Sequence, residues 1–267
     1  SGTEMGGYNL KKRWVLIFVI VACAAVFAFS GWKLLELQLE YKSGEDTYTG
    51  LEEYISIPTP TAPVTDSTST PDQTDEVTEE DTTIWPVVDF DALRDVNSDI
   101  VAWIYLEDTT INYPVVQGDD NSYYLNHMFE GSWNSAGCIF LDSRNEENFS
   151  NRHSIIYGHH MKNDTMFSDL DYYKKQEFYD EHPVILLMTP DRNYKIEVFA
   201  GYVTDVSEDA WELNFTDTQY AEWLTAAKEK SCFVSHVSPQ VEDRVVTLST
   251  CSYEFDGARF VVVGVLV

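Results

Sequence analysis

The spacing of apolar and polar residues divides the chain into three stretches. Residues 14–32 form an unbroken apolar run without a charged side chain, and Thr, Pro, Ser, Asp and Glu dominate residues 43–83. From Asp89 onward, short apolar and β-branched runs alternate with turn residues, which is the pattern of strands in a folded β domain. The sequence therefore predicts an apolar helix, a linker and one folded domain.

Eight short runs in the last stretch predict strands. Many of them alternate with period two or are rich in β-branched residues, and turn sequences such as Asp-Glu-His-Pro at 180–183 and Asp-Gly at 256–257 separate them. A mainly β domain with a few added helices fits a closed barrel of about eight strands. The predicted strands are residues 101–106, 111–116, 138–141, 154–157, 184–188, 194–203, 245–250 and 260–266.

Three amphipathic segments predict the helices that are interposed between these strands. Residues 90–96 have a short apolar face, and residues 165–179 carry Leu170 on the same side as other apolar residues. Residues 216–230 begin with a Thr-Asp cap and turn Trp223 toward the interior.

The apolar run at residues 14–32 predicts a transmembrane helix. At about 1.5 Å per residue it spans about 28 Å, close to the thickness of a bilayer core. A tryptophan stands at each end and basic residues precede it, so residues 1–13 are expected in the cytoplasm and everything beyond the span outside. Residues 1–4, ahead of Met5, resemble an expression scar. A cleaved signal peptide is the alternative, but the run exceeds the usual apolar region of about 7–15 residues.

Residues 33–86 are predicted to connect this span to the folded domain. Residues 34–41 continue the helix, and the acidic, Thr- and Pro-rich part that follows cannot bury enough apolar surface to fold alone. A coil of about 40 residues has an end-to-end distance of roughly 35 Å. We therefore expect a disordered tether that ends where the folded domain, residues 87–267, begins.

The chain is strongly acidic, with 17 Lys and Arg against 45 Asp and Glu and a formal net charge of −28. This balance argues against nucleic-acid partners, because phosphate binding requires a basic face. No set of His, Cys and carboxylates has the spacing of a metal site, and the sequence has no glycine-rich phosphate loop. The acidic pairs at 119–120 and 146–147 are interpreted as solvated loops. Neither a metal nor a cofactor is expected.

Three side chains that can act together stand at strand ends. Cys251 ends one apolar run, Arg259 heads the last strand, and an imidazole, that of His159 or His160, follows the run at 154–157. A free thiol has a pKa of about 8.5, so most copies are protonated at neutral pH, and a nearby guanidinium favours the reactive thiolate. A thiol nucleophile, an imidazole and a fixed positive charge are the groups required for acyl transfer through a thioester.

No catalytic role is expected for the other cysteines and histidines. Inert thiols are expected for Cys138 and Cys232, with a disulfide between them as the alternative, and Cys23 lies in the apolar run. Neighbouring residues on a strand point to opposite faces, so only one of His159 and His160 can face the thiol. Solvated surface positions are expected for His127, His153, His182 and His236.

These stretches resemble the sortases, a family of membrane-tethered cysteine transpeptidases of Gram-positive bacteria. Thr-Leu-Ser-Thr-Cys at 247–251 is similar to the TLxTC signature of the family, and Arg259 stands at the position of its arginine. Tyr-Gly-His-His-Met at 157–161, followed by Thr-Met-Phe at 165–167, is similar to the histidine segment of the class B branch. The resemblance extends from about Asp89 to the end of the chain and implies an eight-stranded, sortase-type β-barrel.

The resemblance also implies roles for particular residues. Cys251 is the implied nucleophile, His159, which follows the glycine, the general acid and base, and Arg259 the group that stabilises the oxyanion or the substrate. Weaker matches imply four substrate-binding residues, Asn121, Leu125, Tyr157 and Ser249. Core packing is the alternative for Leu125 and Tyr157. Class B relatives can carry an acidic residue directly after the cysteine, where this chain has Ser252.

The implied activity is that of a class B, sortase B-like transpeptidase in the cell membrane. Such an enzyme cleaves a C-terminal sorting signal of secreted proteins after a threonine, holds the protein as a thioacyl intermediate on Cys251, and transfers it to an amino group of a peptidoglycan precursor of the lipid II type. The expected topology is single-pass, with the catalytic domain on the extracellular face. The stretch before Asp89 lacks the Asp-Pro-aromatic lid of pilus-building sortases, which favours wall anchoring.

Two other functions remain open from the sequence. A cysteine peptidase could use the same residues and resolve the thioester with water, and comparing products with and without an added amine distinguishes this case. A membrane-anchored binding module with an incidental cysteine is the second alternative. Selective labelling of Cys251 by a small electrophile at neutral pH argues against it.

Overall fold

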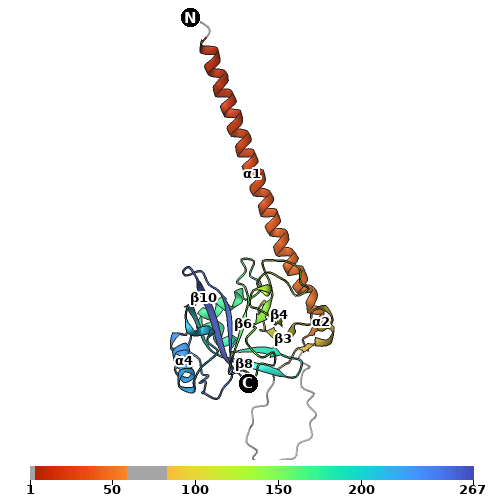
Figure 1. Cartoon of the computed structure of the whole chain (residues 1–267), viewed down its shortest axis with the longest axis vertical. Helices are drawn as coiled ribbons and strands as arrows, with labels where there is room; N and C mark the ends of the chain where they lie inside the picture. The colour runs from red at the N-terminus through yellow and green to blue at the C-terminus, as the bar shows by residue number, and fades with distance from the viewer. Residues whose placement is uncertain (1–3, 59–82) are drawn as a thin grey trace, which may run out of the picture. The chain divides into compact units, whose positions relative to one another are not determined.

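The structure is a computed structural model that describes residues 4–58 and 83–267, with side chains from residue 13 onward. The chain divides into two compact units, Ser1–Asp46 and Thr47–Val267 (Figure 1). The first unit is part of the helix α1 (Glu4–Leu51), which is long and apolar enough to cross a membrane. Most of the predicted tether, residues 59–82, lies outside the described residues.

The folded unit includes residues that the sequence assigned to the linker. α1 continues beyond the expected residue 41 to Leu51, where Tyr48 and Leu51 are buried with exposed fractions of 7% and 8%. These apolar residues are spaced by three, so one helix face carries both of them inward. The turn η1 (Glu52–Tyr54) and the strand β1 (Ile55–Ser56) follow, and β1 pairs antiparallel with β2 (Val87–Val88).

A closed barrel of eight strands forms the centre of the described domain and confirms the expected architecture. The strands neighbour one another in the order β10-β8-β7-β3-β4-β5-β6-β9. The pairs β4–β5 and β6–β9 are parallel, and the other pairs are antiparallel. The strands are β3 (Ile100–Tyr105), β4 (Asn112–Val116), β5 (Ile139–Leu141), β6 (His153–Tyr157), β7 (Val184–Met188), β8 (Asn193–Asp205), β9 (Val245–Cys251) and β10 (Ala258–Leu266).

Short helices connect the strands, and one of them differs from its prediction. The predicted helix at 165–179 is two elements, the 3-10 helix η3 (Ser168–Lys174) and α3 (Gln176–Glu181), separated by the extended residue Lys175. Leu170 and Tyr173 are both fully buried, and a 3-10 helix aligns residues three apart on one side. The remaining short elements are α2 (Phe90–Val96), η2 (Tyr123–Leu125) and η4 (Asp209–Trp211).

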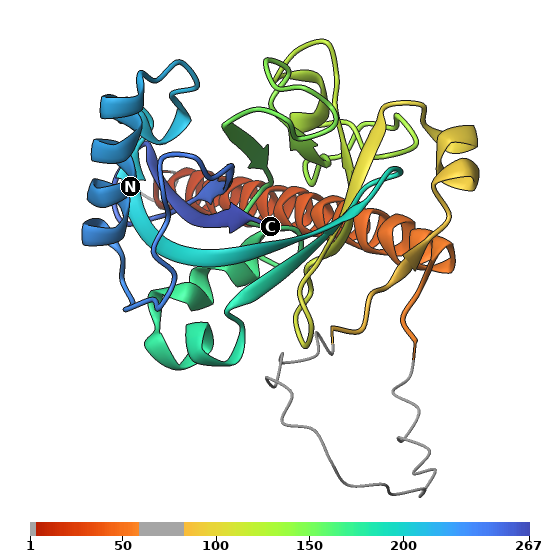
Figure 2. The ribbon, with the colours of Figure 1, turned by 90° about the horizontal axis from the view of Figure 1, so that it is seen from below.

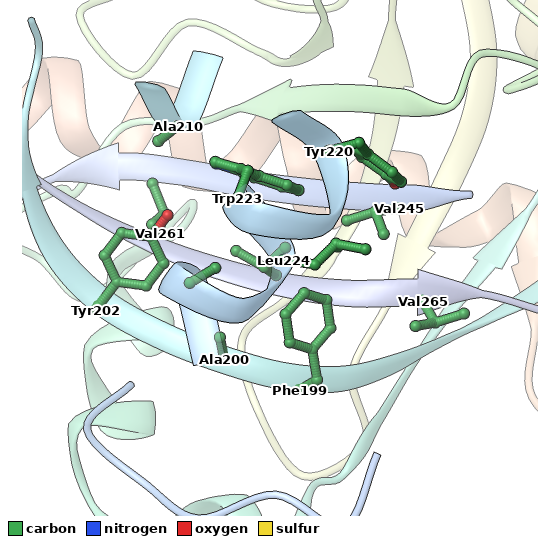
Figure 3. Packing of buried hydrophobic residues seen from close by; sticks show 12 residues of the cluster. Phe199, Ala200, Tyr202, Ala210, Tyr220, Trp223, Leu224, Val245, Val261 and Val265 are labelled. Carbon is green, nitrogen blue, oxygen red and sulfur yellow. The ribbon is translucent and has the colours of Figure 1, made fainter. Parts of the chain in front are cut away.

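The helix α4 (Asp217–Lys230) covers the outer face of the long strand β8 and of β10 (Figure 2). Trp223 and Leu224 of α4 pack against Phe199 of β8 and Val261 of β10 in one buried apolar cluster (Figure 3). Strands β9 and β10 are buried along nearly their whole length because the barrel interior covers one face and α4 part of the other. This packing holds the two strands that carry the candidate thiol and guanidinium.

We expect Thr216→Ala to destabilise the domain by about 1 kcal/mol through α4. Thr216 Oγ1 accepts a hydrogen bond from the backbone N–H of Gln219, and Gln219 Oε1 accepts one from the backbone N–H of Thr216. Alanine removes the hydroxyl oxygen that accepts the hydrogen bond from the backbone N–H of Gln219. Urea unfolding of the full chain should show a lower midpoint, whereas Thr218→Ala, on the exposed surface of the same helix, should not lower it. Equal midpoints for both variants would contradict the capping role.

Candidate active site

Cys251 and Arg259 stand opposite one another on adjacent strands. Cys251 is the last residue of β9, and the antiparallel register with β10 pairs it directly with Arg259. Side chains of directly opposed residues project from the same face, with Cβ atoms about 4.5–5.5 Å apart. The pairing therefore turns the thiol and the guanidinium-bearing side chain to the same face of the sheet, and both residues line the same groove.

The third candidate side chain, His159, lies at the level of Cys251 on the other side of β9. β6 runs parallel to β9 with Tyr157 paired to Ser249, and the N–H of Gly158 donates to the carbonyl of Ser249 at 3.1 Å. His159 and Cys251 each follow their paired residue by two positions. The register thus brings the imidazole, the thiol and the guanidinium to one end of the barrel.

One open groove of about 460 Å³ at this end contains all seven residues that the sequence singled out. The groove is lined by the three candidate catalytic side chains together with Asn121, Leu125, Tyr157 and Ser249. Phe140, Gly158, Val206, Trp211 and Thr250 complete its wall. The alternative that Leu125 serves only core packing does not hold, since 42% of its surface is exposed.

A backbone carbonyl fixes the ring of His159. Its Nε2 lies 2.7 Å from the carbonyl oxygen of Leu125, and because a carbonyl only accepts, Nε2 carries the hydrogen. Nδ1 is then the nitrogen that remains for proton transfer. Glycine is required just before the histidine, since a Cβ on Gly158 would lie 2.5 Å from Ile139 Cδ1 and 2.6 Å from Phe167 Cδ2.

His160 points elsewhere, as strand alternation predicts. It does not line the groove, and its Nδ1 lies 3.9 Å from Asp171 Oδ1 while Tyr253 packs edge-on against its ring. The loop after the thiol is fastened to this region, because Lys174 Nζ binds Asp171 at 3.0 Å and Glu254 at 2.6 Å.

Ser252, the residue directly after the thiol, belongs to the same loop rather than to the groove. Its hydroxyl donates to Glu254, and the residue is 6% exposed. Lys174 Nζ lies 3.3 Å from the same hydroxyl. Ser252 therefore helps to hold the β9–β10 loop and does not line the groove.

A buried carboxylate supports the far wall of the groove. Asp142 is fully buried and accepts hydrogen bonds from Arg144 Nε at 2.8 Å and from the hydroxyl of Tyr157 at 2.9 Å. Burial alone would raise the pKa of Asp142, but hydrogen bonds from Arg144, and weaker ones from Asn121 and Tyr157, lower the pKa to about 2. The carboxylate thus stays charged and holds two groove residues in fixed positions.

Trp211 is a groove residue that the sequence did not reveal. It ends the short helix η4 between β8 and α4, among acidic residues. Its indole N–H lies 3.3 Å from Ser249 Oγ, and its carbonyl lies 3.4 Å from Arg144 Nη2. A single tryptophan among charged residues was the signal available in the sequence. A side chain with so large an apolar surface normally packs against another part of the protein.

The prediction for His153 was wrong, because this histidine is buried with an exposed fraction of 1%. Its Nδ1 donates to the carbonyl of Glu212 at 2.7 Å, and its Nε2 accepts from the hydroxyl of Thr247 at 2.8 Å. Burial lowers the pKa of the ring to about 4, so it is neutral at physiological pH. It begins β6, which the parallel pairing with β9 encloses, and it anchors the loop that carries Trp211.

The cysteines other than Cys251 stay outside the groove. Cys138 is buried and Cys232 is exposed, and both are free thiols, which excludes the disulfide between them. Burial raises the pKa of Cys138 to about 12. Its thiol is therefore protonated and inert, as expected.

Comparisons with known proteins agree on one family. A family model described as the sortase domain matches residues 104–267. Sortase B of Listeria monocytogenes is 34% identical over 245 residues, which covers 91% of this chain and 92% of the relative. The solved Staphylococcus aureus sortase B–substrate complex is 40% identical, covers 67% of this chain and 84% of that one, and superposes with a TM-score of 0.64. A sortase B complexed with triglycine has the same identity, covers 67% of this chain and 85% of that one, and has a TM-score of 0.63.

We expect Asp142→Asn to lower stability by about 2 kcal/mol at pH 7, since charge-assisted hydrogen bonds are lost. The native carboxylate has a depressed pKa, so its contribution is complete above the unfolded pKa of about 3.9 and is lost as pH falls through about 2. Urea unfolding at several pH values should show the difference between the two proteins shrinking between pH 5 and pH 2.

Tyr157→Phe is the matched control for this prediction, because it removes one donor and keeps the charge. Its loss of stability should be smaller, and the acid transition should move to higher pH, since one interaction that lowers the pKa of Asp142 is gone. A difference between Asp142→Asn and the native protein that is as large at pH 2 as at pH 7 would contradict the charged state of Asp142.

Proposed function

The chain belongs to the sortase family and is a sortase B-type cysteine transpeptidase, and from this premise we propose that Cys251, His159 and Arg259 are its catalytic residues. The observation that carries the proposal is the cross-strand pairing of Cys251 with Arg259, with His159 at the same level beyond β9. All three side chains line one open groove, where a peptide can reach them.

In the first half-reaction the thiolate of Cys251 attacks the backbone carbonyl carbon of a threonine in a sorting signal. The S–C bond forms and the carbonyl oxygen takes up the electron pair. As this oxyanion collapses, the C–N bond breaks and the amine leaves with a proton from Nδ1 of the His159 imidazolium. A thioacyl enzyme remains, and general acid catalysis of this kind contributes about 10²–10⁴ in rate.

Arg259 stabilises the two negative charges of this half-reaction, the thiolate before attack and the oxyanion after it. Its guanidinium stays charged throughout and needs no proton transfer. A preorganised donor at an oxyanion contributes about 10²–10³ in rate. Its position directly across from Cys251 supports this double role.

In the second half-reaction an amine attacks the thioester, His159 accepts its proton, and the sulfur leaves as a thiolate. We propose an amino group of a peptidoglycan precursor of the lipid II type as this nucleophile. The solved complex of a sortase B with triglycine supports a primary amine on an unbranched glycine peptide.

The groove beside the catalytic side chains binds the sorting signal in this proposal. Leu125 and Tyr157 offer apolar surface, whereas Asn121 and Ser249 offer polar groups, and all four residues line the groove. Asn121 Oδ1 already accepts from the N–H of Ser143 at 2.8 Å, so its amide is held in a fixed orientation. The solved sortase B–substrate complex supports peptide binding in a groove of this fold.

We expect the full chain, incubated with a pool of candidate sorting pentapeptides, to gain the mass of an N-terminal peptide fragment on Cys251. Peptide mapping by mass spectrometry identifies both the modified residue and the cleaved bond. Addition of triglycine should convert the adduct into a transfer product faster than water hydrolyses it. Release of hydrolysed peptide alone, at the same rate with and without triglycine, would favour a hydrolytic peptidase.

Three variants serve as controls for the thioacyl experiment. Cys251→Ala should form no adduct and show no turnover. His159→Ala and Arg259→Ala keep the thiol and should lower kcat/KM by about 10²–10⁴ and about 10²–10³. Turnover by Cys251→Ala at the native rate would remove the mechanism altogether.

We also propose that residues 14–32 anchor the enzyme in the cell membrane, with the catalytic domain outside. Support comes from the length and apolar composition of α1 and from the basic residues that precede the span. In a Gram-positive host the chain should stay in the membrane fraction after an alkaline carbonate wash. Protease added to intact protoplasts should remove the catalytic domain, and protection of this domain would reverse the proposed orientation.

A further inference from the structure

The end of α1 places a tyrosine against the part of the barrel that carries the groove. Tyr48 is 7% exposed, and its ring packs edge-on against Tyr113 of β4 with 5.2 Å between the ring centroids. Its hydroxyl donates to the carbonyl of Gly137 and lies 3.4 Å from the thiol of Cys138. Burial, reinforced by the neighbouring thiol, raises the pKa of this phenol, so it remains a donor.

The backbone of Gly137, which Tyr48 contacts, also lies directly against the backbone of Leu125. A Cβ on Gly137 would lie 2.3 Å from the carbonyl oxygen of Tyr124 and 2.7 Å from that of Leu125, and its φ is +56°. The N–H of Cys138 donates to the carbonyl of Tyr124 at 2.9 Å. The two backbone segments are thus in direct contact, with no side chain between them.

Leu125 in turn holds the candidate catalytic histidine. Its carbonyl oxygen is the acceptor for His159 Nε2 at 2.7 Å. A displacement of the Gly137 backbone therefore moves the atom that fixes the protonated nitrogen of the imidazole.

A second set of contacts leads from Tyr48 to the backbone of the same histidine. The hydroxyl of Tyr113, on which Tyr48 packs, accepts from the N–H of Met166 at 3.0 Å. The next N–H along the chain, that of Phe167, donates to the carbonyl of His159 at 2.9 Å. Tyr48 thus lies at the junction of both supports, one for the ring and one for the main chain.

We propose that Tyr48 is a positioning residue that keeps His159 in its Nε2-protonated, productive orientation through Gly137 and Leu125. The proposal rests on the proposed catalytic role of His159. It makes the last turn of α1, which the sequence assigned to a disordered tether, a part of the catalytic apparatus. A catalytic domain that begins at residue 87 would lack this support.

The test is Tyr48→Phe in the full chain in detergent micelles, which removes the hydroxyl and keeps the ring. NMR of histidine labelled with ¹⁵N, at a pH well above the ordinary histidine pKa, reads the tautomer of His159 directly. We expect its two nitrogen signals to move toward those of an averaged pair of tautomers, while the other histidines are unchanged. With a peptide that forms the thioacyl adduct, kcat should fall about three- to tenfold at constant KM, equivalent to one hydrogen bond.

Tyr172→Phe is the matched control, because Tyr172 is 46% exposed on η3 and outside the groove. It should leave the signals of His159 and kcat at their native values. A lower thermal midpoint for Tyr48→Phe with native signals and native kcat would show a purely structural role and overturn the proposal. The NMR readout requires no substrate, so it stands even if His159→Ala retains activity and the proposed chemistry fails.

Discussion

The parallel pairing of β6 with β9 is the constraint on which the rest of the site depends. These strands are far apart in the sequence, and their register pairs Tyr157 with Ser249, which sets His159 level with Cys251. The antiparallel register of β9 with β10 then adds Arg259. A slip by one residue in either pair would turn a side chain to the opposite face and separate the three groups. The site is therefore specified by strand register more than by any loop.

Burial of α4 and the polar interactions below the groove protect this register in different ways. The apolar cluster around Trp223 holds β8 and β10 together from outside. Around the groove, Asp142 fixes Arg144 and Tyr157, and Arg144 contacts the loop of Trp211. Hydrogen bonds to a buried charge are directional and strong, so they define the shape of the wall as well as its stability. Apolar packing alone would hold the strands but leave the groove residues less fixed.

Local patterns in the sequence were sufficient for the strands and for the strand-end positions of Cys251 and Arg259, because period-two alternation and strand ends are local properties. The choice of His159 and of the four other groove residues came from the resemblance to the sortases. Local patterns were insufficient where contacts between residues far apart in the sequence decide whether a side chain is buried. His153 looked like an edge residue, yet the pairing of β6 with β9 encloses it. Tyr48 and Trp211 stand in acidic, linker-like segments, and only the folded chain shows which surfaces they cover. The break at Lys175 in the predicted helix likewise follows from tertiary packing of Leu170 and Tyr173.

The group that orients His159 determines which residues stabilise the charges of the proposed reaction. In many nucleophilic sites a carboxylate orients the base and also stabilises its charged form. Here the orienting group is the carbonyl of Leu125, a dipole that fixes the tautomer but carries no net charge. Stabilisation of the thiolate then depends on Arg259, whose charge does not vary with pH in the working range. In the proposed reaction, His159 gives its proton to the leaving amine while its ring is held by this carbonyl. The position of one backbone oxygen, and of the Gly137 backbone in contact with it, thereby becomes part of the reaction.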